Sequence, residues 1–156
     1  MTTSKKAYTE SLPKKRMGAG CLLFNEQGKI LLVKPTYKPG WEIPGGVVEE
    51  NESPKQCCKR ELREELGLER KIGSLLVIEY NCETDEKSES LMFIFDGGIL
   101  YGMEISSIKL PKDELSEFAF FTRQSLPQEM EPALRKRISA IFEQAATGAG
   151  IYIENQ

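Results

Sequence analysis

Three glutamates near the middle of the chain have a spacing that favours a carboxylate cluster. Glu61, Glu64 and Glu65 lie within about two turns of a predicted helix, in which each residue advances by about 100°. Their side chains therefore share an arc of roughly 100° on one helix face. Like charges at this spacing repel one another, so a positive group should offset them. A cluster of hard oxygen ligands suits Mg²⁺ or Mn²⁺.

The same acidic face also has a plainer interpretation, because Glu-rich helix faces are common on protein surfaces. The residues beside it weaken that interpretation. Cys58, Leu62 and Leu66 recur every four residues and predict a buried stripe. This stripe borders the acidic arc, so Glu65 is expected near the buried side of the helix, where a carboxylate needs a partner.

The helix that carries the glutamates has recognisable ends. Ser53 is a good N-cap, Pro54 suits the first helical position, and Gln56 lies where a capping-box partner belongs. Gly67 suits the left-handed position that closes a helix. The pattern predicts a helix over residues 54–66.

The segment from Gly46 to Leu68 resembles the Nudix box. That box is Gly, five residues, Glu, seven residues, Arg-Glu, an aliphatic residue, any residue, Glu-Glu, any residue, Gly and an aliphatic residue. Every fixed position is met, and the preceding segment Trp41–Gly45 also resembles the stretch that commonly precedes the box. The resemblance implies a Nudix-like α/β/α sandwich with a mixed sheet, and a pyrophosphohydrolase that uses Mg²⁺ or Mn²⁺.

The resemblance also implies a role for each matching residue. Arg60 matches the arginine that orients the carboxylates, and Glu52 matches the glutamate that pairs with it. One of the box glutamates, Glu61 or Glu64 for example, would also position or deprotonate the attacking water. The alternative is that Arg60 and Glu52 form a surface ion pair worth under about 1 kcal/mol. The implied metal ligands are Glu61, Glu64, Glu65 and Gly45, the last through its backbone carbonyl.

Metal-assisted attack by water is consistent with the rest of the composition. The chain contains no histidine, which excludes His-based triads and His-containing zinc sites. Divalent ions can bridge phosphate oxygens, lower the pKa of bound water and stabilise a leaving phosphate. Such a reaction needs no covalent nucleophile.

The substrate contacts are less specific in the sequence. Tyr37, Trp41 and Tyr80 are candidates to stack on a base, and Lys34 and Lys38 are candidates to contact phosphate. Each of them has an alternative, since lone aromatic residues often belong to the core or its rim and lysines are often solvated. A further carboxylate ligand from outside the box stays open between two acidic segments, which contain Glu83, Asp85, Glu86, Glu89, Glu104, Asp113 and Glu114.

Absent motifs narrow the substrate class. About fifteen residues past the box, where the ADP-ribose subgroup of the family has a proline, the chain reads Cys82-Glu83-Thr84, and slightly further on, where the diadenosine-polyphosphate subgroup tends to have a tyrosine, it reads Asp85-Glu86-Lys87. These absences leave nucleoside triphosphates, oxidised nucleotides and nucleotide sugars open. Two rival functions remain, a nucleotide-binding sensor without turnover and a prenyl-diphosphate isomerase. The complete box argues against both, and the missing histidine argues further against the isomerase.

The whole chain favours one soluble domain. Its 156 residues carry a net charge of −3, which does not suit non-specific binding of nucleic acid. We expect a flexible lead-in over residues 1–15 and a single Nudix-like domain over 16–156. No apolar run approaches the roughly 20 residues needed to span a membrane. The four cysteines contain no Cys-x-x-Cys pair and are expected to be reduced, mostly buried thiols. We therefore expect a cytoplasmic protein that binds a small nucleotide-like substrate but neither nucleic acid nor membrane; a homodimer stays open.

Hairpin-linked strands and two separated helices predict an α+β or mixed α/β sandwich. A second helix is expected over residues 131–144, with Leu134, Ile138, Ile141 and Phe142 on its apolar face. A short strand is expected at Ile108–Leu110 and a helical turn at Pro111–Ser116. The main strands are expected at Met17–Phe24, Ile30–Val33, Ser74–Tyr80, Leu91–Phe95, Glu117–Thr122 and Ile151–Ile153, with an extended piece at Val47–Glu49.

Overall fold

The computed structural model describes residues 4–144 and 150–156. Its elements, in chain order, are α1 (Lys5–Glu10), β1 (Arg16–Asn25), β2 (Ile30–Pro35), β3 (Gly45–Val47), α2 (Pro54–Leu66), β4 (Leu75–Asn81), β5 (Ser90–Leu100), α3 (Gly102–Ser107), β6 (Leu115–Phe121), the 3₁₀ turn η1 (Arg123–Ser125), α4 (Pro132–Gln144) and β7 (Ile151–Asn155). The strands form one seven-stranded sheet in the order β6-β2-β1-β5-β4-β7, with β3 paired to β1 beside this path. The sheet is mixed, because β1 and β5 run parallel, as do β4 and β7, while the other pairs are antiparallel.

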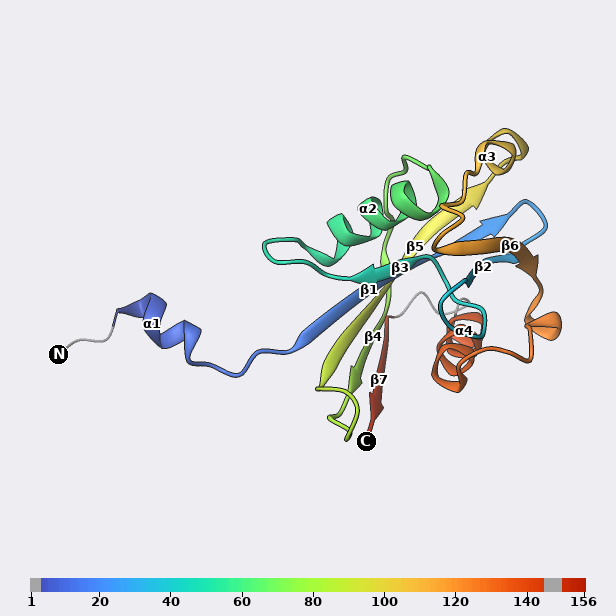
Figure 1. The fold of residues 1–156 in the computed structure, drawn as a ribbon. Coiled ribbons are helices and arrows are strands. Elements are labelled where there is room, and N and C mark those ends of the chain that lie inside the picture. The colour runs from blue at the N-terminus through green and yellow to red at the C-terminus, as the bar shows by residue number, and fades with distance from the viewer. Residues whose placement is uncertain (1–3, 145–149) are drawn as a thin grey trace.

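Helices cover both faces of this sheet. Successive side chains of a strand point to opposite faces, so β1 contributes to two separate cores. Ala19, Cys21 and Leu23 pack in one cluster with residues of α2, whereas Leu22 packs in the other with residues of α4. Figure 1 shows α2 and α4 on opposite sides of the strands. The expected α/β/α sandwich with a mixed sheet is confirmed.

Helix α2 has the bounds that its sequence predicts. The hydroxyl of Ser53 accepts a hydrogen bond from the Gln56 backbone N–H at 3.2 Å, and the Gln56 side chain accepts one from the Ser53 N–H at 2.8 Å. At the other end Gly67 adopts a left-handed conformation with φ of 70°. Leu62 and Leu66 are fully buried, which confirms the predicted apolar stripe.

Three local predictions were wrong. Ile108–Leu110 forms no strand, whereas the helical turn expected at Pro111–Ser116 is present: the Leu115 N–H donates to the Pro111 carbonyl at 2.8 Å, where β6 begins. The short helix α3 was not expected, because its six residues carry no buried side chain that would mark a helical stripe. Strand β5 continues past Phe95 to Leu100. A Cβ on Gly97 would lie 2.8 Å from the Leu22 carbonyl oxygen, so this glycine belongs to a tightly packed strand rather than to a turn.

The segment before β1 contains a helix as well as extended chain. Helix α1 begins after its N-cap Ser4, all of its residues are exposed, and Figure 1 shows it away from the sheet. The expectation of a flexible lead-in over residues 1–15 also covers residues 1–3, which lie outside the described residues. Within the described ranges, no helix is long and apolar enough to cross a membrane. All four cysteines are free thiols, and three of them are buried.

Candidate active site

Glycines allow the box strand to lie close to its neighbours. In the pairing of β3 with β1, Gly45 lies opposite Gly20. A Cβ on Gly20 would lie 2.9 Å from the Pro44 carbonyl oxygen, and one on Gly46 would lie 2.2 Å from Oε1 of Glu61. The side-chain-free face of β1 therefore receives a neighbouring segment of chain, and Gly46 leaves room for a carboxylate of α2.

Arg60 connects the loop, the strand and the helix of the box. Its Nε and Nη2 donate to the two carboxylate oxygens of Glu52 at 2.9 and 3.1 Å. Its Nη1 donates to Glu61 at 2.6 Å and to Glu64 at 3.0 Å, and Nη2 also reaches the Val47 carbonyl at 3.0 Å. The hydrogen bond from Arg60 lowers the pKa of Glu52, and the hydrogen bond to Glu52 is the largest cause that raises the pKa of Arg60. The guanidinium is the positive group that the acidic helix face requires.

Glu65 is a largely buried carboxylate that forms no ion pair with any described residue. The Gly45 backbone N–H donates to its Oε2 at 3.0 Å. Burial raises the pKa of Glu65 to about 8, although the Gly45 hydrogen bond acts in the opposite direction. Burial also raises the pKa of Glu61, against the lowering effect of Arg60. The box therefore contains more buried negative charge than Arg60 alone offsets.

This donor set fits a hard divalent cation in its chemistry. The oxygens belong to carboxylates, and a buried carboxylate without a cationic partner is stabilised by a metal ion. The side chains are not gathered around one point, however: across residues 4–144 and 150–156 no three acidic, cysteine or histidine side chains form a group that would hold a metal. Glu61 and Glu64 are turned to Arg60, and Glu65 is turned to Gly45. A cation would compete with these donors for the oxygens.

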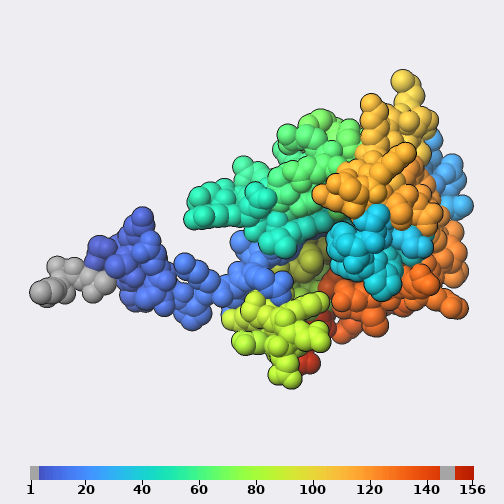
Figure 2. Space-filling view, in the orientation of Figure 1, coloured from blue at the N-terminus to red at the C-terminus, as the bar shows by residue number. Residues whose placement is uncertain are grey.

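A cleft of about 500 Å³ lies beside the box. Figure 2 shows the molecule hollowed between the green box helix, the lime segment that follows β4 and the orange-red helix α4. The wall next to the carboxylates is β3. The other lining residues come from β1, the loop 37–43, the loop 81–88, β5 and the start of α4, and they include Arg16, Gly18, Gly20, Tyr37, Lys38, Glu42, Ile43, Lys87, Ser88, Met92, Glu131, Leu134 and Arg137.

Three of the candidate substrate contacts, Tyr37, Trp41 and Lys34, lie in different environments. Tyr37 is 71% exposed and lines the cleft. Trp41 packs edge-on against Phe121, with ring centroids 5.0 Å apart. The Lys34 ammonium lies 5.7 Å from the centroid of the Trp41 ring, and neither Lys34 nor Trp41 lines the cleft. Of these three residues, only Tyr37 lies where it can contact a molecule in the cleft.

The acidic segments expected to supply an extra ligand do not line the cleft with their carboxylates. In the loop after β4, residues such as Thr84, Lys87 and Ser88 line the cleft instead. The acidic residues that do line it are Glu42 and Glu131, and Glu42 pairs with Lys38 at 2.5 Å. Glu42 lies three residues before Gly45, and this nearness to the box in the sequence is the feature that could have indicated it.

The family of the chain follows from a comparison of its sequence with known families. The model of the NUDIX domain matches residues 14–141. The chain belongs to the NUDIX domain family. This assignment covers the box, both sheet-covering helices except the last residues of α4, and every residue of the site described above.

Relatives of this NUDIX protein share only part of their length with it. An ADP-ribose pyrophosphatase of Methanocaldococcus jannaschii is 32% identical over 111 residues, which are 68% of this chain and 62% of that protein. An RNA pyrophosphohydrolase of Hydrogenovibrio crunogenus is 44% identical over 54 residues, 35% of this chain and 33% of that protein. The chain thus spans from a third to about three-fifths of the length of these relatives.

Solved structures of the same fold resemble this NUDIX domain over most of its length. A MutT protein from Methanosarcina mazei has a TM-score of 0.68 at 23% identity, covering 86% of this chain and 99% of that one. A UDP-X diphosphatase has a TM-score of 0.75 at 20% identity, covering 97% of this chain and 76% of that one. At these identities the likeness concerns the fold alone.

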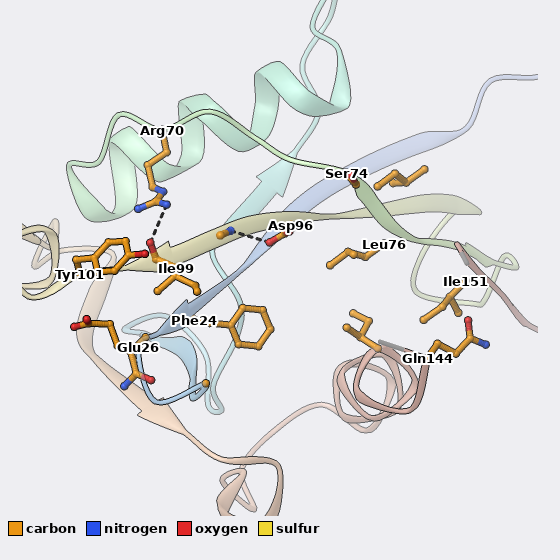
Figure 3. Close-up of a pocket in the computed structure, with 15 residues that line it drawn as sticks. Phe24, Glu26, Arg70, Ser74, Leu76, Asp96, Ile99, Tyr101, Gln144 and Ile151 are labelled. Carbon is orange, nitrogen blue, oxygen red and sulfur yellow. Dashed lines mark hydrogen bonds between the residues drawn. The ribbon is translucent and has the colours of Figure 1, made fainter. Parts of the chain in front are cut away.

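A second hollow of about 930 Å³ is larger but lies away from the box of this NUDIX domain (Figure 3). Its lining contains no box residue, and two of its charged side chains, Arg70 and Asp96, have hydrogen-bond partners among the described residues of the protein, although Nε of Arg70 has none. Arg70 donates to the Ile99 carbonyl at 3.0 Å, and Asp96 accepts from the Gly98 N–H at 2.8 Å. Size alone therefore does not identify the active site here.

Proposed function

We propose that this NUDIX protein uses Mg²⁺ or Mn²⁺ to hydrolyse a diphosphate linkage in a nucleoside diphosphate derivative. One observation carries the proposal: a cleft of substrate size has as one wall the strand β3, whose Gly45 and Gly46 contact the carboxylates of Glu65 and Glu61. The proposed metal ligands are Glu61, Glu64, Glu65 and the carbonyl of Gly45.

The bound cation would supply charge neutralisation for the phosphates and a water of lowered pKa. The chain's own residues perform the remaining tasks. Arg60 holds Glu61 and Glu64 in place, and Glu52 fixes the guanidinium through both of its oxygens. In this proposal one of the box carboxylates accepts the proton of the attacking water. Tyr37, exposed on the rim of the cleft, contacts the substrate.

The substrate class that we propose is a nucleoside triphosphate, an oxidised nucleotide or a nucleotide sugar. The RNA pyrophosphohydrolase among the relatives adds one further candidate, a triphosphorylated RNA 5′ end. That likeness covers 35% of this chain. A small molecule is favoured by the net charge of −3 and by the size of the cleft.

The test is a panel of nucleotides, nucleotide sugars and a 5′-triphosphorylated RNA incubated with Mg²⁺. Released phosphate and pyrophosphate would be measured by a coupled assay. We expect at least one small nucleotide to be hydrolysed and its turnover to stop in EDTA. Tight nucleotide binding without any product would instead support the sensor, and conversion of a prenyl diphosphate to its isomer would support the isomerase.

We also retain a cytoplasmic location and a homodimer as proposals from the sequence. The location rests on the reduced state expected of the four cysteines, all free in the structure. Fractionation of the source cells tests the location. Sedimentation velocity at micromolar protein concentration distinguishes a dimer from a monomer of 17.6 kDa.

A further inference from the structure

Arg137 of α4 lines the cleft and has no part in the hydrolysis described above. Its side chain is 11% exposed, and its Nε donates to a carboxylate oxygen of Glu79, which is fully buried on β4. Within the described residues this is the only side-chain hydrogen bond of Arg137. Among the described residues, Nε of Arg70 is the one fully buried polar side-chain atom without a hydrogen-bond partner. The Nη groups of Arg137 have no such partner either, so they are not fully buried, and they are accessible from the cleft that Arg137 lines.

The carboxylate that holds Arg137 is itself held on its other side. Asn155 of β7 donates to the second oxygen of Glu79 at 2.6 Å and to Asn81 at 3.0 Å. Both oxygens of Glu79 are therefore engaged, and the position of the guanidinium is fixed before any ligand arrives. Fixed donors lose little conformational freedom when they bind.

The ion pair with Glu79 also determines which kind of ligand group Arg137 can bind favourably. Because Glu79 neutralises the positive charge, the floor of the cleft offers N–H donors with little net charge. A phosphate would gain little Coulomb energy there, whereas an uncharged acceptor such as a carbonyl oxygen is well matched. The phosphates belong at the other wall, beside the carboxylates that would hold a metal.

The surroundings of Arg137 suit a flat, apolar ring. Ile43, Met92 and Leu134 line the same cleft, and Gly18 and Gly20 line it without side chains. Apolar walls with a few fixed polar groups are typical of sites that bind small molecules.

We propose that Arg137 determines base specificity by donating to the carbonyl edge of the substrate's base. The preferred bases are then guanine, hypoxanthine or uracil, since guanine presents O6 and N7 as acceptors to an arginine fork. Adenine and cytosine place an amino donor at the corresponding position, which a guanidinium cannot accept. This inference rests on the proposed function, because it assigns the substrate of the same cleft.

The test compares kcat/KM for GTP with that for ATP, and for UTP with that for CTP, in wild type and Arg137→Lys. Lysine retains the positive charge that pairs with Glu79, but it lacks the two parallel N–H donors of the guanidinium. We expect wild type to favour GTP over ATP by at least about tenfold, mainly through KM, and the variant to lose that preference. The matched control is Arg135→Lys on the same helix, which donates to the Pro127 carbonyl and does not line the cleft; it should keep the preference.

Other outcomes overturn the proposal. Equal rates on all four nucleotides in wild type would contradict it, as would an unchanged preference in Arg137→Lys. If Arg137→Lys loses all four activities equally, Arg137 is only a structural residue. Should that variant fail to fold, the double variant Glu79→Gln/Arg137→Gln removes both buried charges together and takes its place.

Absence of turnover in wild type would contradict the proposed function and leave this inference testable. Binding of GMP and AMP would then be measured by calorimetry without metal. Wild type should bind GMP at least about tenfold more tightly than AMP, and Arg137→Lys should bind both alike. Equal binding by wild type would overturn the inference.

Discussion

At the scale of single residues, the box glutamates and Arg60 have opposite effects on stability. Glu65 is partly buried without an ion pair among the described residues, so its ionisation in the folded state costs free energy and its pKa is raised. Arg60 instead bonds to three carboxylates and one carbonyl. Removing a glutamate relieves repulsion, whereas removing the arginine leaves several acidic groups unpaired.

We predict that Glu64→Gln and Glu65→Gln each lower kcat by at least about a hundredfold while the protein stays folded. Losing one carboxylate weakens metal binding and removes transition-state charge stabilisation. The neutral side chain at position 65 also removes a group whose ionisation is opposed by burial, so the melting temperature should not fall. Steady-state rates in saturating Mg²⁺ and thermal melting test this. An unchanged rate in both variants would place the chemistry elsewhere.

Arg60→Ala should reduce both activity and stability. Glu52 and Glu61, whose side chains are 13% and 14% exposed, would lose their charge-assisted partner, at a cost of roughly 1–3 kcal/mol. The matched control is Arg63→Ala on the same helix, because the Arg63 side chain is 61% exposed and, among the described residues, pairs only with the exposed Glu69. Chemical denaturation and rates of both variants provide the measurement. If Arg60→Ala behaves like Arg63→Ala, the network is only a surface contact.

The raised pKa of Glu65 predicts how the stability of the metal-free protein changes with pH. Burial raises this pKa from 4.5 to about 8, so the folded state holds a proton between these values that the unfolded state has released. The contribution of Glu65 to the free energy of unfolding is therefore largest below about pH 4.5, and this contribution is lost as the pH rises through about 8. Glu61, whose pKa is also raised by burial, acts in the same direction.

We expect the melting temperature in EDTA to fall between pH 6 and pH 8.5, and to fall less in Glu65→Gln. The same scan of the variant is the control, because it removes this carboxyl and leaves the rest of the fold. A wild-type curve that rises over this range, or one identical to that of the variant, would contradict the placement of Glu65 in a buried site.

At the scale of elements, the site depends on the close approach of β3 to α2. The 2.2 Å distance from a Cβ on Gly46 to Glu61 leaves no room for a methyl group without displacing the carboxylate. We expect Gly46→Ala to lower kcat by at least about tenfold with a small loss of stability. Gly102→Ala is the control, since a Cβ there would meet nothing within 4 Å. Equal rates in the two variants would show that the position of Glu61 does not matter.

Local signals explain why α2 was predicted well. Its N-cap, its first-turn proline and its left-handed closing glycine are all within a few residues of the helix they bound. The long β5 was predicted only in part, because Gly97 and Gly98 resemble a turn in the sequence, and the close packing of Gly97 against β1 appears only in the folded sheet. Caps act over a few residues, whereas close strand packing depends on a partner far along the chain.

At the scale of the whole molecule, the carboxylates could be predicted and the cleft could not. The acidic arc lies in one helix, so its geometry follows from helical spacing. The cleft combines β1, β3, β5, α4 and two loops, which only the sheet topology brings together. Arg137 shows the difference most clearly, because the Glu79 that holds it lies 58 residues earlier in the chain.

The measurement that tests the central claim most directly is metal-dependent release of phosphate or pyrophosphate from the best nucleotide substrate. The protein would first be stripped with EDTA, with metal removal confirmed by elemental analysis, and then titrated with Mg²⁺. We predict no turnover in the stripped wild type, full recovery with Mg²⁺, and no recovery of the wild-type rate in Glu65→Gln. Full turnover by the metal-free protein would contradict the account.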